Sequence, residues 1–561
     1  MQQPFGVSPH SRDTGAAGAQ PAAGDASAGP QPNTASAATP NPALPNPALS
    51  DRLLRSWLRC RRRAWLDRHG PADGRRWSAH RALTLQDQLL SFQTLLPRKP
   101  GHGEEACRRG DAGVMGVRLR GVGPAGLALE AHPPLLQRVE SPSRWGDHGY
   151  RPVLVRQGRN LTREHRLVLA LWGRLLAEHQ GAPVPQALVL AGSGGLLQQE
   201  RFTLSSGLQQ QLEEVLPRLA ADLAASGAMP PLVNDRRKCT LCSWRTLCDG
   251  EAAREGHLSE VSGIGGKRRD LLISLGIGSL DDLARSDPDQ LAAALEQHGD
   301  QHRDVAPQLV AQARVQALGV SRRIDAGSPL PELRRAPGVL IYDIESDSDA
   351  RDDFLHGLLR LRRGSDGGSG DWPSAAAAAT APYHPVLALQ EHGEPRLWRR
   401  LRTLLARYPD WPVLHYGETE AVGLLRLAER QGAGDAERSQ LRRRLIDVHQ
   451  RLRRHWLLPV NSYGLKAVAG WQGFHWQQDG VDGARCLLWW RQWRLDRGRP
   501  AVPPRLAARP LERIFRYNRD DALATWAVVR WMLDQEAAPG DAPGDAQGEP
   551  PPRSRQGESD G

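Results

Sequence analysis

The stretch GVLIYDIE, residues 338–345, indicates the fold of this chain more clearly than any other part of the sequence. Its run of apolar residues is typical of a buried strand. The run carries Asp343 and Glu345, whose side chains point to the same side because strand side chains alternate. Two carboxylates on one face repel each other unless a cation lies between them. The strand therefore predicts a metal site.

A second acidic pattern lies near the end of the chain, in RIFRYNRDDALATWAVV, residues 513–529. Tyr517 and Asp521 are four residues apart and therefore share one face of a helix. The neighbouring Asp520 points about 100° away around the helix, so we expect it to be exposed. Residues 326–536 open with the apolar strand and close with this helix, which predicts an α/β domain.

The combination of D-x-E on a first strand and Y-x3-D on a late helix resembles the DEDDy branch of the RNase H-like 3'-5' exonucleases. The resemblance implies an RNase H-like mixed sheet and catalysis by two Mg²⁺ or Mn²⁺ ions. It also implies a role for each residue of the pattern: Asp343 binds both ions, Glu345 one, Asp521 the other, and Tyr517 orients the attacking water.

The same family carries a further acid in a middle motif, usually an aspartate. VLHYGETEAVGLLRLAER, residues 413–430, fits this motif best, with Glu420 as the preferred ligand and Glu418 as the other choice. Asp447, in RLIDVHQRL, resembles a secondary aspartate that these domains carry near the site. The tryptophan-rich segment before the last helix is suited either to base stacking or to the core.

Composition indicates a soluble, multidomain protein. Its 561 residues correspond to about two to four domains. The net charge of +11 favours an acidic partner such as nucleic acid, with DNA preferred over RNA. Neither a signal sequence nor an apolar run long enough to span a membrane is present, so we expect a cytoplasmic protein without a membrane partner.

Three segments are predicted between two tails. Residues 1–48 and 537–561 are rich in Ala, Pro, Gly and Ser and predict disordered tails, because they cannot bury enough apolar surface to offset chain ordering. The predicted ordered segments are 49–250, 251–325 and 326–536.

CTLCSWRTLC, residues 239–248, places Cys239, Cys242 and Cys248 within ten residues. Six cysteines in a long chain favour a metal site over a disulfide framework in a reducing compartment. A structural zinc or a [4Fe-4S] cluster needs a fourth ligand. Cys60, on the amphipathic segment SWLRCRRRAW, is preferred as that ligand, and the alternatives are Cys107, Cys486 and His257.

A single cysteine at the start of a segment and C-x2-C-x5-C at its end resemble the iron-sulfur staple of RecB-like PD-(D/E)XK nucleases of the AddB type. The resemblance implies a [4Fe-4S] cluster, with zinc as the alternative, that pins the two ends of residues 49–250 together. Matching the family motifs places Pro134, Leu154 and Arg156 where two acids and a lysine belong. The segment is therefore expected to be a degenerate PD-(D/E)XK scaffold without activity.

VSGIGGKRRDLLISLGIGSLDDLA, residues 261–284, resembles a helix-hairpin-helix in a small helical segment. Gly263 and Gly265 would allow the tight turn, and amides at the following helix start, together with Lys267 and Arg268, would meet a phosphate. Such contacts are independent of base sequence. Glycine hairpins also join helices that bind nothing, which is the alternative. A Walker A loop is not present.

The three segments together resemble a bacterial family of RecB-like nucleases. We expect a metal-dependent 3'-5' exonuclease whose C-terminal domain is catalytic, with a helicase or repair protein as a possible partner. The alternative is a catalytically inactive iron-sulfur protein that binds nucleic acid as a scaffold in DNA repair or processing. The set of Asp343, Glu345, Tyr517 and Asp521 favours the enzyme.

Overall fold

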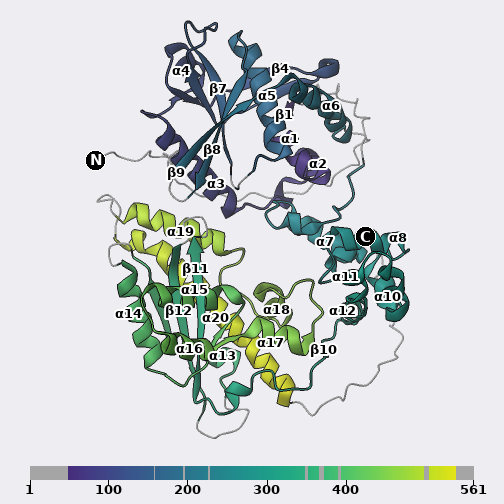
Figure 1. Ribbon diagram of the computed structural model, residues 1–561, viewed down its shortest axis with the longest axis vertical. Helices are drawn as coiled ribbons and strands as arrows, with labels where there is room; N and C mark the ends of the chain where they lie inside the picture. Colours follow the sequence, from purple (N-terminus) through teal and green to yellow (C-terminus); the bar gives the residue numbers. More distant parts are fainter. Residues whose placement is uncertain are drawn as a thin grey trace, which may run out of the picture. The chain divides into compact units, whose positions relative to one another are not determined.

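The computed structural model describes residues 48–537 except for residues 157, 159, 194–195, 225–227, 348–351, 365–371, 390–392 and 498–503. Apart from residues 48 and 537, the two tails predicted to be disordered lie outside the described residues. Among the described residues, no helix is long and apolar enough to cross a membrane. The chain is a mixed α/β protein with several sheets, as the sequence predicts (Figure 1).

A six-stranded sheet organises the N-terminal part of the described chain. Strand β7 pairs antiparallel with β6 and parallel with β8, and the buried helix α5 connects β7 to β8. The strands in order are β2 (Gly101–His102), β3 (Gly113–Met115), β6 (Leu135–Val139), β7 (Gly149–Arg156), β8 (Gln186–Ser193) and β9 (Leu196–Thr203). A second sheet contains β1 (Leu49–Ser50), β5 (Ala128–Ala131) and β4 (Leu119–Val122). The helices are α3 (Ala79–Leu95), α4 (Gly103–Arg109), α5 (Arg163–Gln180) and α6 (Ser206–Asp222).

The basic helix that the sequence predicts at the start of this part is divided in two. Helix α1 (Asp51–Arg59) and helix α2 (Arg61–His69) meet at Cys60, whose backbone is extended. The Cys60 sulfur accepts a hydrogen bond from the backbone N–H of Arg63 at 3.4 Å and so caps α2. The break places the Cys60 thiol at the start of α2 and not in the middle of one continuous helix.

The middle part of the chain is helical, as predicted. Leu258, Leu272, Leu283, Leu295 and Val310 are all buried in one small core. The helices around it are α7 (Arg245–Glu255), α8 (Gly266–Ser274), α9 (Leu280–Arg285), α10 (Pro288–Glu296), α11 (Asp300–Arg303) and α12 (Ala306–Leu318).

A five-stranded mixed sheet forms the centre of the C-terminal part. Strand β11 pairs antiparallel with β12 and parallel with β14, and the sheet order is β13-β12-β11-β14-β15. The strands are β11 (Gly338–Asp347), β12 (Asp352–Arg362), β13 (Tyr383–Leu387), β14 (Val413–His415) and β15 (Leu445–Asp447). The apolar stretch GVLIYDIE thus lies in the central strand of this sheet.

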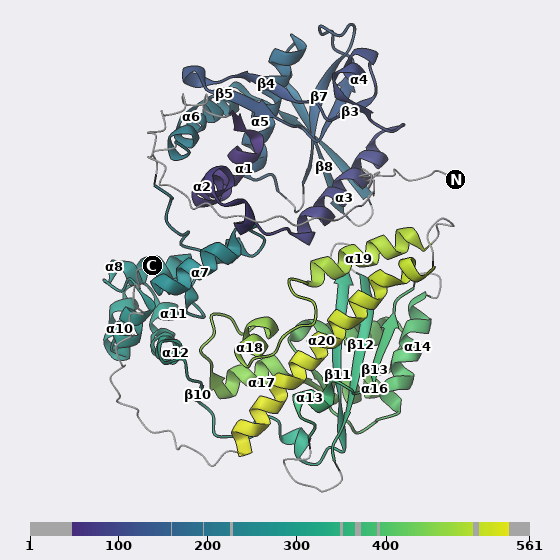
Figure 2. The same ribbon diagram turned by 180° about the vertical axis from the view of Figure 1, so that it is seen from behind.

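Helices cover both faces of this sheet. On one face, Leu340 and Tyr342 of β11 pack against α14 (Gly393–Ala406) and α15 (Glu418–Arg430), with α16 (Asp435–Arg444) beside them. On the other face, Val339 and Ile341 pack against α20 (Pro504–Ala537), which crosses the sheet in Figure 2. Asp343 has the same parity as Ile341, so it projects from the α20 face.

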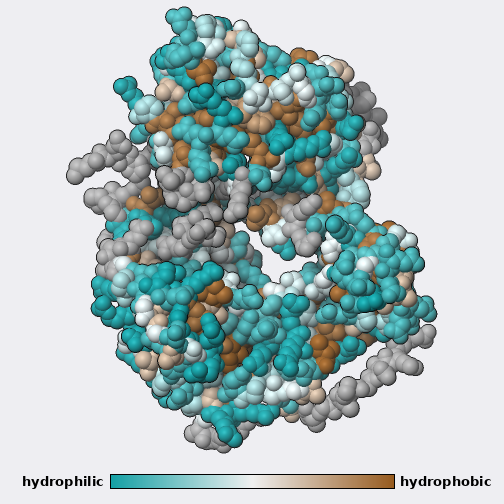
Figure 3. Space-filling model, viewed as in Figure 1, coloured by the Kyte–Doolittle hydropathy of each residue, from teal (hydrophilic) through white to brown (hydrophobic). Residues whose placement is uncertain are grey.

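The remaining elements lie mainly on the α20 side of the sheet. They are β10 (Arg322–Arg323), which pairs with β16 (Trp456–Leu457), and the helices α13 (Ala375–Ala378), α17 (Val448–His455), α18 (Leu465–Trp471) and α19 (Gly483–Asp496). Hydrophilic residues make up most of the visible surface in the space-filling view, with apolar residues in scattered patches (Figure 3).

Candidate metal centre

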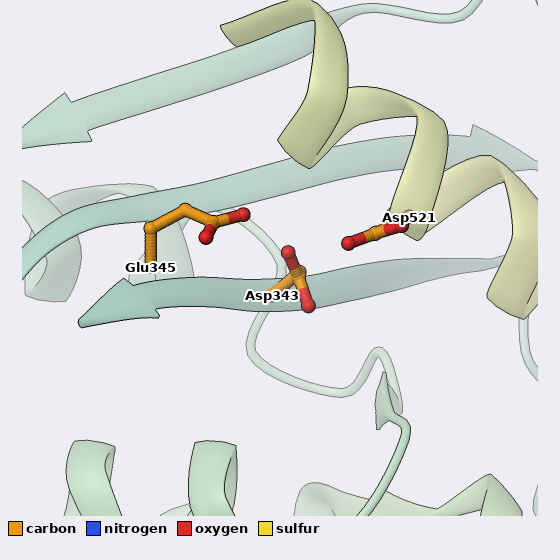
Figure 4. Close-up of side chains that lie close together, drawn as sticks. All are labelled: Asp343, Glu345 and Asp521. Carbon is orange, nitrogen blue, oxygen red and sulfur yellow. The ribbon is translucent and has the colours of Figure 1, made fainter. Parts of the chain in front are cut away.

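Three carboxylates from two elements meet at the end of the central strand. Asp343 and Glu345 come from β11 and Asp521 from α20, and a ligand oxygen from each lies within 4.8 Å of the others (Figure 4). Burial and the neighbouring carboxylates raise the pKa of Asp343 and that of Glu345 well above their usual values. Burial also raises the pKa of Asp521 to about 6. Oxygen ligands held this close suit a hard divalent cation, whose charge would offset the repulsion.

Tyr517 lies beside this group, one turn before Asp521 on α20. Its side chain is buried, and its hydroxyl donates a hydrogen bond to the Asp521 carboxylate. The shared helix face that the four-residue spacing predicts is therefore present in the structure. A phenol in this position can hold a water molecule next to a metal-bound carboxylate.

The prediction that Asp520 is exposed is wrong. Asp520 is only 2% exposed, and its carboxylate accepts hydrogen bonds from the backbone N–H of Gln477 at 2.8 Å and from the Gln477 side chain at 3.1 Å. The segment that follows α18 covers this side of α20. Rotation around the helix axis gives the direction of a side chain but not which distant segment packs there.

Asn518, which no sequence pattern indicated, holds the acids from the position after Tyr517 on α20. Asn518 is fully buried, and its Nδ2 donates to Asp343 Oδ2 at 2.6 Å and also to the Glu345 carboxylate. Its Oδ1 accepts from the Tyr383 hydroxyl at 2.8 Å. The available signal was an amide residue placed next to the tyrosine of the Y-x3-D pattern.

Trp476 and Lys466 also contact the centre. Trp476 Nε1 donates to Asp521 Oδ1 at 2.6 Å, so this member of the tryptophan-rich segment positions a carboxylate. Lys466 Nζ lies 5.0 Å from the centroid of the Tyr517 ring and donates to the Val481 carbonyl. The lysine charge lowers the pKa of the Glu345 and Asp521 carboxyls, against the larger effect of burial.

Glu420 lies in the first turn of α15, near the three carboxylates but outside their 4.8 Å group. Its charge acts on both Asp343 and Glu345, and burial raises its pKa to about 7. Its Oε2 is buried and has no hydrogen-bond partner among the described residues. Glu418, the other choice for the middle acid, is exposed. A buried carboxylate oxygen without a protein partner is suited to bind a metal ion as a fourth ligand.

Asp447 supports the motif from the neighbouring strand. Its Oδ1 accepts from the backbone N–H of Gly417 at 3.1 Å and from that of Gln450 at 3.1 Å. It therefore caps α17 and holds the turn that leads into α15. Gly417 has φ of +109°, a backbone conformation that favours glycine.

The four residues predicted to contact phosphate come together at the start of α8. Gly263 has φ of +95°, and Gly265 is the N-cap of α8. Lys267 is exposed, whereas Arg268 donates to the Gly263 carbonyl and is tied to the turn.

The four cysteines of the predicted cluster line one cavity of about 450 Å³. The arginines that also line it are Arg59, Arg62, Arg63, Arg236 and Arg245. No three cysteine sulfurs lie within 4.8 Å of one another in the described part of the chain. A closed zinc site with Zn–S bonds of about 2.3 Å would require closer sulfurs. Cys107, Cys486 and His257, the other candidate ligands, lie outside this cavity. Burial raises the pKa of the Cys107 thiol to about 12.

The positions matched to the PD-(D/E)XK motifs carry no acid in the structure. Leu154 is buried in the core of β7, and Pro134 immediately precedes β6. Arg156, at the end of β7, donates to the carbonyl of Gly158. The RecB-like interpretation of residues 49–250 remains a prediction.

Comparison with known proteins adds one finding. Residues 340–533 match the family model of the RNase H superfamily, whereas no curated protein matches the sequence. The matched range begins in β11 and ends in α20, so it contains Asp343, Glu345 and Asp521. The C-terminal part is thus an RNase H-like domain, which indicates nuclease-type activity, nucleic acid as ligand and Mg²⁺ or Mn²⁺ as cofactor.

Proposed function

We propose that the RNase H-like domain is a divalent-metal 3'-5' exonuclease that acts on DNA in preference to RNA. The observation that carries the proposal is the convergence of Asp343, Glu345 and Asp521 within 4.8 Å, with Tyr517 hydrogen-bonded to the last of them. Glu420 completes the metal site. The carboxylates fit Mg²⁺ or Mn²⁺ because these ions prefer oxygen ligands.

Two ions bound by these carboxylates would activate water and stabilise the leaving 3'-oxygen. Tyr517 orients the attacking water toward the terminal phosphorus, opposite the leaving oxygen. Asn518 and Trp476 hold Asp343 and Asp521 in place through the hydrogen bonds described above. The water oxygen bonds to phosphorus and the P–O3' bond breaks, which gives a nucleoside 5'-monophosphate and a strand with a new 3'-hydroxyl.

The direct test uses protein purified without oxygen and single strands labelled at the 5' or the 3' end, as DNA and as RNA. With Mn²⁺ or Mg²⁺, we expect the 5'-labelled strand to shorten progressively and the 3'-labelled strand to release a labelled mononucleotide at once. EDTA should stop both reactions. Absence of hydrolysis with every metal would refute the exonuclease and leave the inactive binding protein, whereas release of the 5' label first would refute the 3'-5' polarity.

Replacement of Glu420 by glutamine tests the middle acid. We expect a fall in kcat of about 100-fold, because a neutral amide is a poor ligand for a divalent ion. Glu418→Gln is the matched control and should stay within about twofold of wild type, since Glu418 is exposed two residues away. Steady-state kinetics at saturating Mn²⁺ separate the two variants; equal losses would remove Glu420 from the site.

The N-terminal part is proposed to grip the strand without cutting it. The pairing of β6 with β7, the crossover helix α5 and the parallel strand β8 support a RecB-like scaffold, while Leu154 in the core excludes a ligand at that position. The turn at Gly263 would contact phosphates independently of base sequence. We also propose that a helicase or repair protein delivers single strands to the enzyme and that the protein is located in the cytoplasm.

A [4Fe-4S] cluster is proposed as the ligand of Cys60, Cys239, Cys242 and Cys248. The five arginines around their cavity support it, because a cubane with four thiolates carries net negative charge. The residues hold the group in a structural role, at the junction of α1 and α2.

Cys60→Ser should remove the broad visible absorbance expected of freshly purified protein and lower its thermal stability. The cause is loss of one of four ligands that join distant segments. Cys107→Ser is the matched control and should keep the absorbance, since Cys107 lies outside the cavity. Colourless wild-type protein with stoichiometric zinc would contradict the iron assignment and leave zinc.

A further inference from the structure

A cavity of about 790 Å³ lies on the face of the C-terminal sheet opposite the metal centre. It is bounded by β12, α14 and α15. His356 of β12 lines it and pairs across the sheet with Ile344, so both side chains point to the α14 and α15 face. Asp343 and Glu345 point to the other face, where α20 lies (Figure 2). Asp343 and Glu345 therefore lie outside the cavity, whereas Glu420 lies on the segment of α15 that bounds it.

His356 is a buried donor without a partner. The side chain is 1% exposed, and Nε2 has no hydrogen-bond partner among the described residues. Nδ1 lies 2.7 Å from the hydroxyl of Tyr342, which is itself buried and has no other hydrogen-bond partner among the described residues. The hydroxyl therefore donates to Nδ1 and the proton of the neutral ring is on Nε2. The backbone of Asp353 also acts on the ring and raises its pKa against the larger effect of burial, but Nε2 has no partner with hydrogen-bond geometry among the described residues.

Burial lowers the pKa of His356 to about 4, so the ring is neutral at physiological pH. Buried N–H groups are nearly always paired in folded proteins. An unpaired one that lines a cavity of this size indicates an acceptor supplied by a ligand.

The rest of the cavity has an apolar part and a charged mouth. The apolar side chains are Leu389, Leu397, Val422 and Leu427, and Gly393 and Gly423 also line the cavity. Asp353 accepts from Ser346 through Oδ1 at 2.6 Å, which leaves Oδ2 for other contacts.

Two arginines of α15 stand at the mouth. Arg430 is held by Glu394 at the cavity wall. Arg426 is exposed and has no partner in the described structure. A ligand of matching chemistry has a flat apolar body with an acceptor next to a donor, and an anionic group at the other end.

We propose that this cavity binds a free nucleoside 5'-monophosphate. The base lies among the apolar side chains, with a ring acceptor on His356 Nε2–H and an amino or imino N–H on Asp353 Oδ2, while the phosphate reaches Arg426. Such a molecule is also what the proposed exonuclease would release. Binding at this site does not depend on that activity, so the two proposals can fail separately.

Isothermal titration of the full-length protein with dGMP, dAMP, dCMP and dTMP, the mononucleotides that hydrolysis of DNA would release, tests the site. EDTA in the buffer, and a parallel titration of the Asp343→Asn variant, exclude binding at the metal centre. We expect one of the four to bind with 1:1 stoichiometry under both conditions. Absence of binding by all four, or binding only with Mn²⁺ and intact Asp343, overturns the proposal.

Three variants locate the ligand. Arg426→Ala, at an exposed position that cannot disturb the core, should weaken binding about tenfold. Val422→Trp, which fills the cavity from a position that is 41% exposed, should abolish it. Arg400→Ala, an exposed arginine of α14 outside the cavity, should leave binding unchanged. Equal affinity of all three variants would overturn the proposal.

Discussion

Replacement of Asp343 by asparagine is expected to lower the rate of metal-dependent hydrolysis by about 1,000-fold, or about 4 kcal/mol of transition-state stabilisation. Asp343 lies between the two other acids of the group and is the residue proposed to contact both ions. An amide has nearly the same shape but lacks the charge that binds a divalent cation. The Asn518 contact can be kept, because the amide oxygen of the new residue accepts the same hydrogen bond.

The same substitution should stabilise the metal-free protein. One of three carboxylates within 4.8 Å of one another becomes neutral, so the charge repulsion among them in the folded protein decreases. Thermal denaturation with EDTA should give a higher Tm for Asp343→Asn than for wild type, and added Mn²⁺ should raise the Tm of wild type alone. Asp289→Asn, at an exposed position of α10, is the control without either effect. A variant that keeps more than about a tenth of the activity would remove Asp343 from the centre.

Replacement of Gly357 by alanine is expected to reduce kcat by about 100-fold without touching a metal ligand. A methyl group built on Gly357 of β12 would lie 1.8 Å from Asn518 Oδ1 and 2.9 Å from the Tyr383 hydroxyl. Both distances are shorter than non-bonded atoms allow, so Asn518 must move. Since Asn518 Nδ2 donates to Asp343, displacement of the amide is passed to the metal centre.

The Gly357→Ala variant should also lose stability by about 1–3 kcal/mol, as an overpacked core does. Gly470→Ala is the matched control, because a methyl group there meets nothing within 4 Å and Gly470 is an exposed residue of α18. Folding is checked by circular dichroism, and kcat and KM are measured at saturating Mn²⁺. A stably folded variant with normal kcat would show that the Asn518 contact does not position Asp343.

The residues predicted correctly from sequence are those whose relation is local. Strand alternation placed Asp343 and Glu345 on one face, and helical spacing placed Tyr517 with Asp521. Asp520 was misplaced because its exposure depends on Gln477, which lies 43 residues earlier and packs against it through the fold.

The supports of the site were harder to predict for the same reason. The Asn518 amide accepts a hydrogen bond from Tyr383 of β13 and packs against Gly357 of β12, so its position depends on two other strands. Trp476 comes from a segment whose composition fits either a base-stacking surface or the core. Only the folded structure shows that its indole N–H donates a hydrogen bond to Asp521 of α20. The match to the RNase H superfamily supports the domain but does not assign these contacts.

The three carboxylates come from distant parts of the sequence, and this separation matters during protein synthesis. Asp521 follows Asp343 by 178 residues (521 − 343), so the strand leaves the ribosome long before the helix that completes the group. Ordering a chain segment of this length must precede the contact, which makes the centre a late product of folding. The proposed metal centre can therefore assemble only after the helix that carries Asp521 has been synthesised.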